Sequence, residues 1–297
     1  MKISLCPDGA TAVIVETRPI QLAKGEEEVR FDGFPPSLLP ETLSFAFIIP
    51  ADCPAWAKTV HCRKAGEEVE GGLVPYGTKS LVVLIESEFE GEALVEISYQ
   101  VSQVSSSVTY NVTLGPEGAE VTGWLTVENG SGLPLEGQIQ VVADSVDRRI
   151  IVPVMSSTVI AEGRTEIGLI FARDCRHVRK MVFVPDQLVR GVWEAAIIPN
   201  NRENGLGVAL PGGMVNLSFA EGGWRHLLLQ GTTAERAVGE SLSVLIQPRP
   251  DLVEVEGEGS SITFHNLSSG AVEVEFTGRD GRTETVSLPG GARKQID

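Results

Sequence analysis

Several residue classes are scarce in this 297-residue chain. It has four cysteines, aromatic residues make up only 6%, and no apolar run approaches the roughly 18 residues that a membrane-spanning helix needs. We therefore expect no membrane span. Four cysteines are too few for a disulfide-rich scaffold, so we expect reduced and mostly buried thiols, with one disulfide between Cys53 and Cys62 as the alternative.

Positive charge is also in short supply. The chain carries 24 Lys and Arg residues against 40 Asp and Glu residues, a formal net charge of −16. Phosphate groups would be repelled by such a protein, so neither nucleic acid nor an anionic membrane is expected as a general partner. The hydrophobic fraction of 42% is ordinary for a globular protein, which excludes wholesale disorder.

The first apolar stretch is interrupted by Pro7, Asp8 and Gly9, which is unlike a secretory signal. The expected location is therefore the cytoplasm. A cell-envelope location is the alternative if a leader has been removed.

Alternating apolar and polar residues dominate the chain and predict β-strands. Val95, Ile97 and Tyr99 alternate with polar residues between positions 94 and 101, and the same period of two recurs at intervals of about 10 to 14 residues. The segment 272–288, with Asp280-Gly281 at its centre, predicts a hairpin. The nearest helical candidates, 54–70 and 232–238, are short and poorly periodic. The predicted fold is all-β, with two or three antiparallel β-sandwich or Ig-like units and very little helix.

Two loop-like segments rich in Gly and Glu, at 65–72 and 253–259, suggest where the domains divide. We predict an N-terminal β domain at 1–88, a central β-sandwich domain at 89–255, and a small C-terminal β unit at 256–297 packed on the central domain.

Short motifs along the chain resemble the mucoidy-inhibitor-A-like family. They are Asp8-Gly9-Ala10, Phe31-Asp32-Gly33-Phe34-Pro35, Ile97-Ser98-Tyr99-Gln100-Val101, Leu210-Pro211-Gly212-Gly213 and Ile262-Thr263-Phe264-His265-Asn266. The resemblance implies a bacterial protein with an N-terminal β domain and a C-terminal domain of unknown function, associated with the cell envelope. The long coiled coil that separates these parts in the family is missing here. The family supplies no accepted catalytic residue.

One segment stands out against the acidic background as a candidate binding site. Within residues 173–180 lie four basic side chains and a histidine: Arg173, Arg176, His177, Arg179 and Lys180. A functional interpretation is recognition of an anionic group or an acidic partner. The alternative is a solvated edge strand whose charges block pairing with other strands.

Other chemistry has weaker signals. Cys175 and His177 could contribute to a zinc site completed by Cys53 and by His61 or Cys62, or could form a catalytic dyad, but the spacing favours ordinary buried thiols. The tryptophans could line a carbohydrate-binding surface, or could pack between layers. They are Trp56, Trp124, Trp193 and Trp224.

These observations predict a non-enzymatic protein-interaction or scaffold module with an unidentified protein partner. No catalytic residue, metal or cofactor is expected. A small-ligand or glycan-binding β-sandwich module is the alternative, and an unannotated hydrolase is the third possibility.

Overall fold

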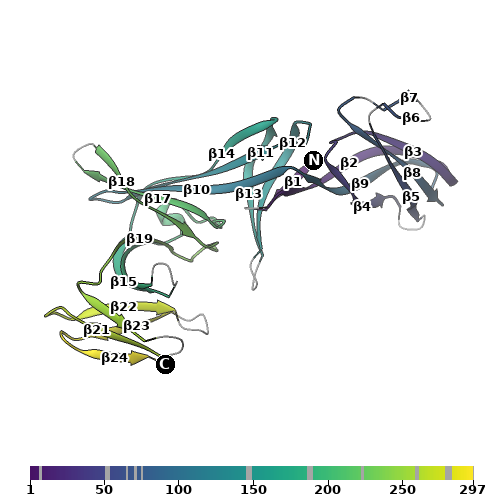
Figure 1. Ribbon diagram of the computed structural model, residues 1–297. Helices are drawn as coiled ribbons and strands as arrows, with labels where there is room; N and C mark the ends of the chain where they lie inside the picture. Colours follow the sequence, from purple (N-terminus) through teal and green to yellow (C-terminus); the bar gives the residue numbers. More distant parts are fainter. Residues whose placement is uncertain are drawn as a thin grey trace. The chain divides into compact units, whose positions relative to one another are not determined.

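The computed structural model describes residues 1–6, 9–50, 54–64, 66–69, 72–74, 76–144, 149–185, 190–221, 224–257, 261–277 and 283–296 (Figure 1). The protein is built almost entirely of β-strands, which confirms the predicted fold class. Within the described residues the only helical element is the single 3₁₀ turn η1 (Arg202–Asn204), and none of them forms a helix long and apolar enough to cross a membrane. The candidate helix at 54–70 is instead largely strand in its described part.

Most strands follow one another along the chain with short connections, and the longer connection 199–212 holds η1. The first half contains β1 (Lys2–Leu5), β2 (Thr11–Leu22), β3 (Gly25–Phe34), β4 (Leu38–Ile48), β5 (Ala55–Arg63), β6 (Glu68–Val69), β7 (Gly72–Leu73), β8 (Lys79–Ser87), β9 (Gly91–Ser102), β10 (Val104–Leu114), β11 (Ala119–Asn129) and β12 (Leu135–Asp144). The second half contains β13 (Arg149–Ile160), β14 (Gly163–Cys175), β15 (Val178–Val184), β16 (Gly191–Ile198), β17 (Gly213–Glu221), β18 (Trp224–Thr233), β19 (Leu242–Pro248), β20 (Val253–Glu256), β21 (Ile262–Asn266), β22 (Val272–Thr277), β23 (Thr283–Leu288) and β24 (Arg293–Ile296).

These strands form several separate sheets. Their strand orders are β13-β12-β1-β2-β9-β4, β14-β11-β10-β17-β18, β19-β16-β15-β22-β23, β20-β21-β24, β3-β8-β5 and β6-β7. Most pairs are antiparallel, as expected from the sequence. Among the pairs whose register is defined by described residues, three are parallel, and each joins strands that are far apart in the chain: β1 with β12, β10 with β17, and β15 with β22.

Two local predictions can be followed strand by strand. In β9, Val95, Ile97 and Tyr99 are buried and the intervening Glu96 is exposed, so the predicted alternation is confirmed. The C-terminal hairpin is also confirmed, because β22 and β23 are antiparallel from Val272 opposite Leu288 onward. Its predicted turn at Asp280-Gly281 lies outside the described residues.

The chain groups into two compact units. Unit 1 comprises Met1–Val108 and Trp124–Leu169, and unit 2 comprises Thr109–Gly123 and Ile170–Asp297. The division therefore falls inside β10, β11 and β14, so neither unit is one continuous segment. The three-domain division expected from the sequence stays a prediction.

In unit 1, the β3-β8-β5 sheet packs on the β2-β9-β4 part of the six-stranded sheet. Phe34 of β3 meets Tyr99 of β9 edge to face, with ring centroids 5.3 Å apart, and Phe31 meets Phe45 of β4 at 6.4 Å. Edge-to-face rings are a favoured geometry in protein cores. The opposite face of β2-β9-β4 carries exposed residues, such as Glu92 and Glu96 of β9.

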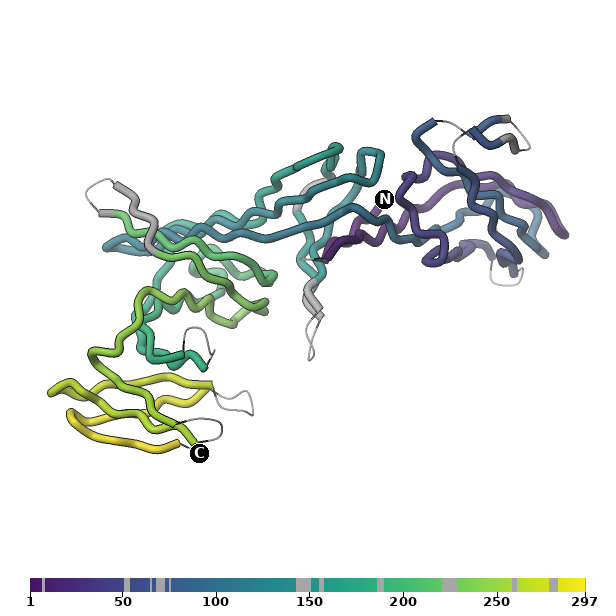
Figure 2. The backbone as a smooth tube through the Cα atoms, viewed as in Figure 1, coloured from purple at the N-terminus to yellow at the C-terminus, as the bar shows by residue number. Residues whose placement is uncertain are grey.

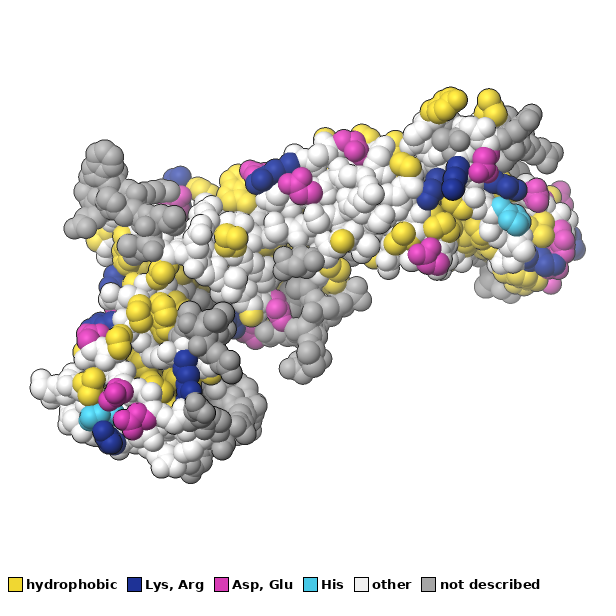
Figure 3. Space-filling model, in the orientation of Figure 1, with side chains coloured by type: hydrophobic (Ala, Val, Ile, Leu, Met, Phe, Trp, Pro, Cys, Tyr) yellow, Lys and Arg dark blue, Asp and Glu magenta, His cyan; other side chains and the backbone are white. Residues whose placement is uncertain are grey.

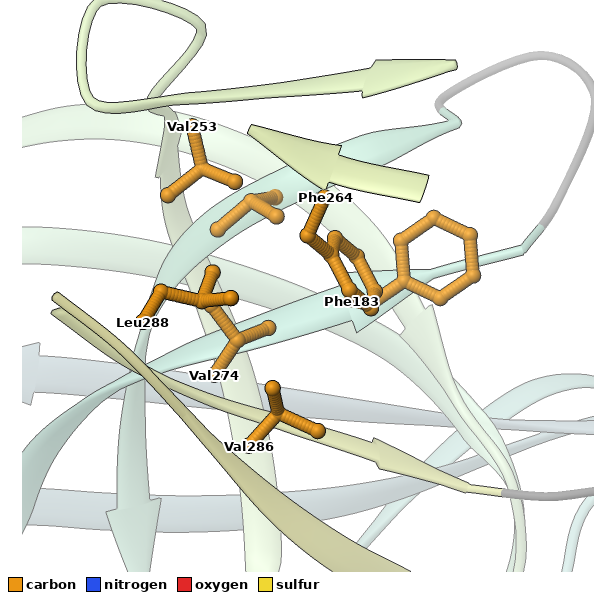
Figure 4. Close-up of a cluster of buried hydrophobic side chains, with 7 residues drawn as sticks. Phe183, Val253, Phe264, Val274, Val286 and Leu288 are labelled. Carbon is orange, nitrogen blue, oxygen red and sulfur yellow. The ribbon is translucent and has the colours of Figure 1, made fainter. Parts of the chain in front are cut away.

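In unit 2, the last strands form a small sandwich whose core is shown in Figure 4. Phe183 of β15 and Phe264 of β21 pack edge to face at 5.3 Å, and Val274 and Leu288 are completely buried beside them. Figure 2 shows how the chain folds back on itself in this C-terminal, yellow-green region. Burying each such aliphatic or aromatic side chain contributes about 1.5–3 kcal/mol.

Candidate binding sites

The basic segment 173–180 lies in unit 2 and connects the last part of β14 to β15, which belongs to another sheet. Arg173 belongs to the end of β14, Arg176 and His177 form the connection, and Arg179 and Lys180 lie in β15. The β14 strand is outermost in its sheet, as the edge-strand alternative expects, but β15 lies between β16 and β22. The edge-strand explanation therefore does not cover the β15 part of the segment.

The connection between β14 and β15 is held by Asn204 of η1. The Arg176 backbone N–H donates to Asn204 Oδ1 at 3.0 Å, and Asn204 Nδ2 donates to the carbonyls of Arg176 and Pro199 at 3.2 and 2.9 Å. The Cys175 thiol donates to the Asn204 carbonyl at 3.1 Å. These contacts give the segment a defined backbone path.

Cys175 itself is completely buried. Burial, assisted by the nearby Asp174, raises the pKa of its thiol above the ordinary value. A thiol that is buried and kept protonated is a poor nucleophile and a poor metal ligand. The geometry of Cys175 thus fits a structural thiol.

The basic side chains of this segment have separate partners. Arg179 forms an ion pair with Glu194 at 3.1 Å, Lys180 forms one with Glu275, and the Arg173 guanidinium stacks on the Phe171 ring at 4.8 Å. Arg179 and Lys180 are successive residues of one strand, so they point to opposite faces of the sheet. The structure therefore spreads these cations instead of gathering them, and their recognition of an anionic group stays a prediction.

His177 is the unexplained member of the segment. It is partly buried, and its Nδ1 atom is inaccessible and has no hydrogen-bond partner among the described residues. The neighbouring Arg176 side chain is exposed.

Sequence reasoning missed Glu194, a buried acid in β16. It is only 7% exposed; its Oε2 accepts a hydrogen bond from Gln247 at 2.8 Å, and Arg179 and Arg249 lie 3.1 and 3.5 Å from its carboxylate. The hydrogen bond from Gln247, together with the two guanidinium groups, holds the pKa of this carboxyl below its ordinary value. The sequence does contain one indication of this site. Glu194 is the single acidic residue in the apolar run 192–198, and an acidic residue is unusual in a strand that becomes buried.

Three of the four cysteines lie among the described residues. Cys6, Cys62 and Cys175 are free thiols, whereas Cys53 lies outside the described residues. Within the part of the chain that the structure describes, no group of three or more His, Cys, Asp or Glu side chains is arranged to hold a metal ion.

The four tryptophans lie in different surroundings. Trp56 and Trp124 are each 42% exposed, and the Trp124 ring lies beside Gly168, where an added Cβ would be 3.9 Å away. Trp193 is partly buried in unit 2, and the side chain of Trp224 is outside the described set. A carbohydrate-binding surface built from the tryptophans stays a prediction.

A more continuous surface feature lies on the solvent-facing side of the β2-β9-β4 sheet. Leu94 of β9 is paired with Pro19 of β2 on one side and with Ile48 of β4 on the other. We call these three residues the apolar row. Leu94 and Ile48 are 43% and 54% exposed, and the row borders a depression of about 520 Å³.

In comparisons with known proteins, no family model, no curated protein and no solved structure matches the chain.

Proposed function

We propose that this protein is a non-enzymatic protein-interaction or scaffold module, and that the apolar row of unit 1 is the centre of its contact surface. The observation that carries the proposal is the register of the row. Three apolar side chains from three adjacent strands point to solvent side by side, where an outward face of an antiparallel sheet is usually polar.

The apolar row has the features of an interface centre. Leu94 and Ile48 belong to regular paired strands, so the sheet already fixes their backbone and little backbone entropy remains to be lost on binding. Covering such a row removes apolar surface from water at about 25 cal/mol per Å².

The surroundings of the row indicate the chemistry of the partner. Glu92 and Glu96 lie on the same face of β9, two residues on either side of Leu94, and both are exposed. A partner that matches this surface presents an apolar centre with lysine or arginine at its rim. Electrostatic complementarity of this kind mainly accelerates association and sets specificity.

The test is affinity capture from the source organism with purified protein, followed by mass spectrometry and by affinity measurement with each captured protein. The double variant Leu94→Asp/Ile48→Asp should bind the true partner at least tenfold more weakly than the wild type. The matched control is Val159→Asp, which changes an exposed apolar residue of the same sheet on β13 and should leave the affinity unchanged. Equal affinity of the double variant and the wild type would overturn the proposal.

The proposed lack of enzymatic activity is tested separately. A screen with ester, phosphate and glycoside substrates should show no turnover, and turnover lost on replacing Cys175 or His177 would support the hydrolase alternative instead. The resemblance to the mucoidy-inhibitor-A-like family and the cytoplasmic location also stay predictions, the first supported by short motifs alone.

A further inference from the structure

A groove in unit 2 differs in chemistry from three other depressions in the described part of the chain. It has a volume of about 410 Å³ and lies between the β17–β18 hairpin on one side and β15, β16 and β19 on the other. Figure 3 shows hydrophobic side chains gathered at the surface over these elements. Pockets that bind small molecules have volumes of about 300–1,000 Å³.

The floor of the groove is the face of β15 and β16 that points away from the core in Figure 4. Phe183 and Val192 point into that core, so their neighbours Val184 and Trp193 point to the opposite face. Leu245 of β19 is paired with Ala195, two residues after Trp193, and extends the same face. Val184, Trp193 and Leu245 all line the groove and are only partly buried.

The wall of the groove contains a glycine at its centre. Gly231 of β18 is paired with Val215 of β17, and both line the groove together with Leu229. A Cβ atom added to Gly231 would meet no heavy atom within 4 Å. A glycine inside a strand weakens the strand and often marks a place where a ligand or another backbone approaches closely. Here the missing side chain keeps the groove open.

Among the described residues that line the groove, none has an ionisable side chain, although 22% of the chain is charged. Its polar groups are neutral: Gln230, Thr232 and Ser243. Three other depressions in the described part of the chain are lined in part by charged residues, including Glu92, Glu128 and the Lys180–Glu275 pair. A charged ligand would lose its hydration in this groove without gaining a partner of opposite charge.

We infer that this groove is a binding site for an uncharged, mostly apolar small molecule that carries one or two hydrogen-bonding groups, such as a fatty alcohol. Its apolar body lies on Trp193, Val184 and Leu245, and its polar end meets the hydroxyl of Ser243, which lies on the same face of β19 as Leu245. This site is independent of the apolar row in unit 1, so each proposal can fail without the other.

The test uses the neutral fluorescent probe N-phenyl-1-naphthylamine with the full chain. Its fluorescence should rise and saturate, and 1-decanol should displace it at least tenfold more effectively than decanoate. Gly231→Phe fills the groove and should weaken probe binding at least tenfold. The matched control Gly168→Phe changes a strand glycine outside the groove and should leave binding unchanged.

Circular dichroism and urea unfolding establish that the Gly231→Phe protein is folded. If it does not fold, Gly231→Val and Ser243→Leu make the same test with fewer added atoms, and each should weaken binding. Absence of saturable binding by the wild type, or unchanged binding by the folded groove variants, would overturn the site. Equal displacement by decanoate would overturn the assignment of an uncharged ligand.

Discussion

Glu194 shows how a single residue changes the meaning of a sequence motif. The segment 173–180 suggests an available cluster of positive charge, yet the carboxylate of Glu194 neutralises Arg179 and is itself supported by Gln247 and Arg249. A carboxylate this deeply buried is retained only when it has charged or hydrogen-bonding partners. In this protein Arg179, although itself exposed, is therefore a partner of a buried carboxylate of unit 2.

The lowered pKa of Glu194 predicts a dependence of stability on pH. Because its folded-state pKa lies below the ordinary value of 4.5, ionised Glu194 stabilises the fold above that pH, and this contribution is lost as the pH falls through the folded-state pKa. Glu194→Gln should lower the free energy of unfolding by about 1–3 kcal/mol at pH 7. The difference from the wild type should shrink below pH 4.5.

Urea unfolding at a series of pH values measures this effect. The control is Glu136→Gln, which replaces an exposed acid of β12 and should change the free energy of unfolding by no more than about 0.5 kcal/mol. If the difference in the free energy of unfolding between Glu194→Gln and the wild type stayed constant from pH 7 to pH 3, ionised Glu194 would not be the source of the stabilisation.

At the scale of elements, two strand ends are tied down by the same asparagine arrangement. Asn266 ends β21, and its Nδ2 donates to the carbonyls of Gly270, Leu288 and Pro289 at 2.8, 2.8 and 3.1 Å, while the Ser268 N–H donates to its Oδ1. This side chain joins the end of β21 to the end of β23.

Asn129 repeats the arrangement in unit 1. It ends β11, and its Nδ2 donates to the carbonyls of Leu133 and Ile160, the latter at the end of β13, while the Ser131 N–H donates to its Oδ1 at 3.0 Å. The shared Asn-x-Ser pattern forms an Asx turn in both places. A side-chain amide thus replaces backbone pairing where each strand stops.

Replacing Asn266 by Asp tests this role. A carboxylate has no N–H to donate and would face three carbonyl oxygens in a buried position, so we expect a loss of about 3–5 kcal/mol in the free energy of unfolding. Ser268→Ala keeps the amide contacts and should cost no more than about 1.5 kcal/mol. Urea unfolding monitored by tryptophan fluorescence measures both, and similar losses for the two variants would contradict the assigned role.

At the scale of the whole molecule, the three parallel strand pairs determine how distant segments come together. Ile3 of β1 is opposite Ile139 of β12, and Tyr110 of β10 is opposite Val215 of β17. Closing such long loops costs conformational entropy before the strands can pair. Chains that depend on these non-local pairs fold slowly.

We therefore expect refolding on a timescale of about milliseconds to seconds or longer, with at least one populated intermediate because of the chain length. Stopped-flow dilution from urea, followed by tryptophan fluorescence and far-ultraviolet circular dichroism, measures this directly. Complete single-phase refolding in less than a millisecond would show that the non-local pairs do not limit the rate.

The sequence alone determined the parts of this protein that depend on neighbouring residues. The alternation of Val95, Ile97 and Tyr99, and the paired runs around Asp280-Gly281, predict strands and a hairpin because side chains in a strand alternate between two faces. Only the tertiary structure decided the parallel pairs, the contact between Glu194 and Arg179, and the groove beside Gly231. Each of these joins residues whose positions along the chain do not constrain their distance in space, so packing between sheets had to bring them together.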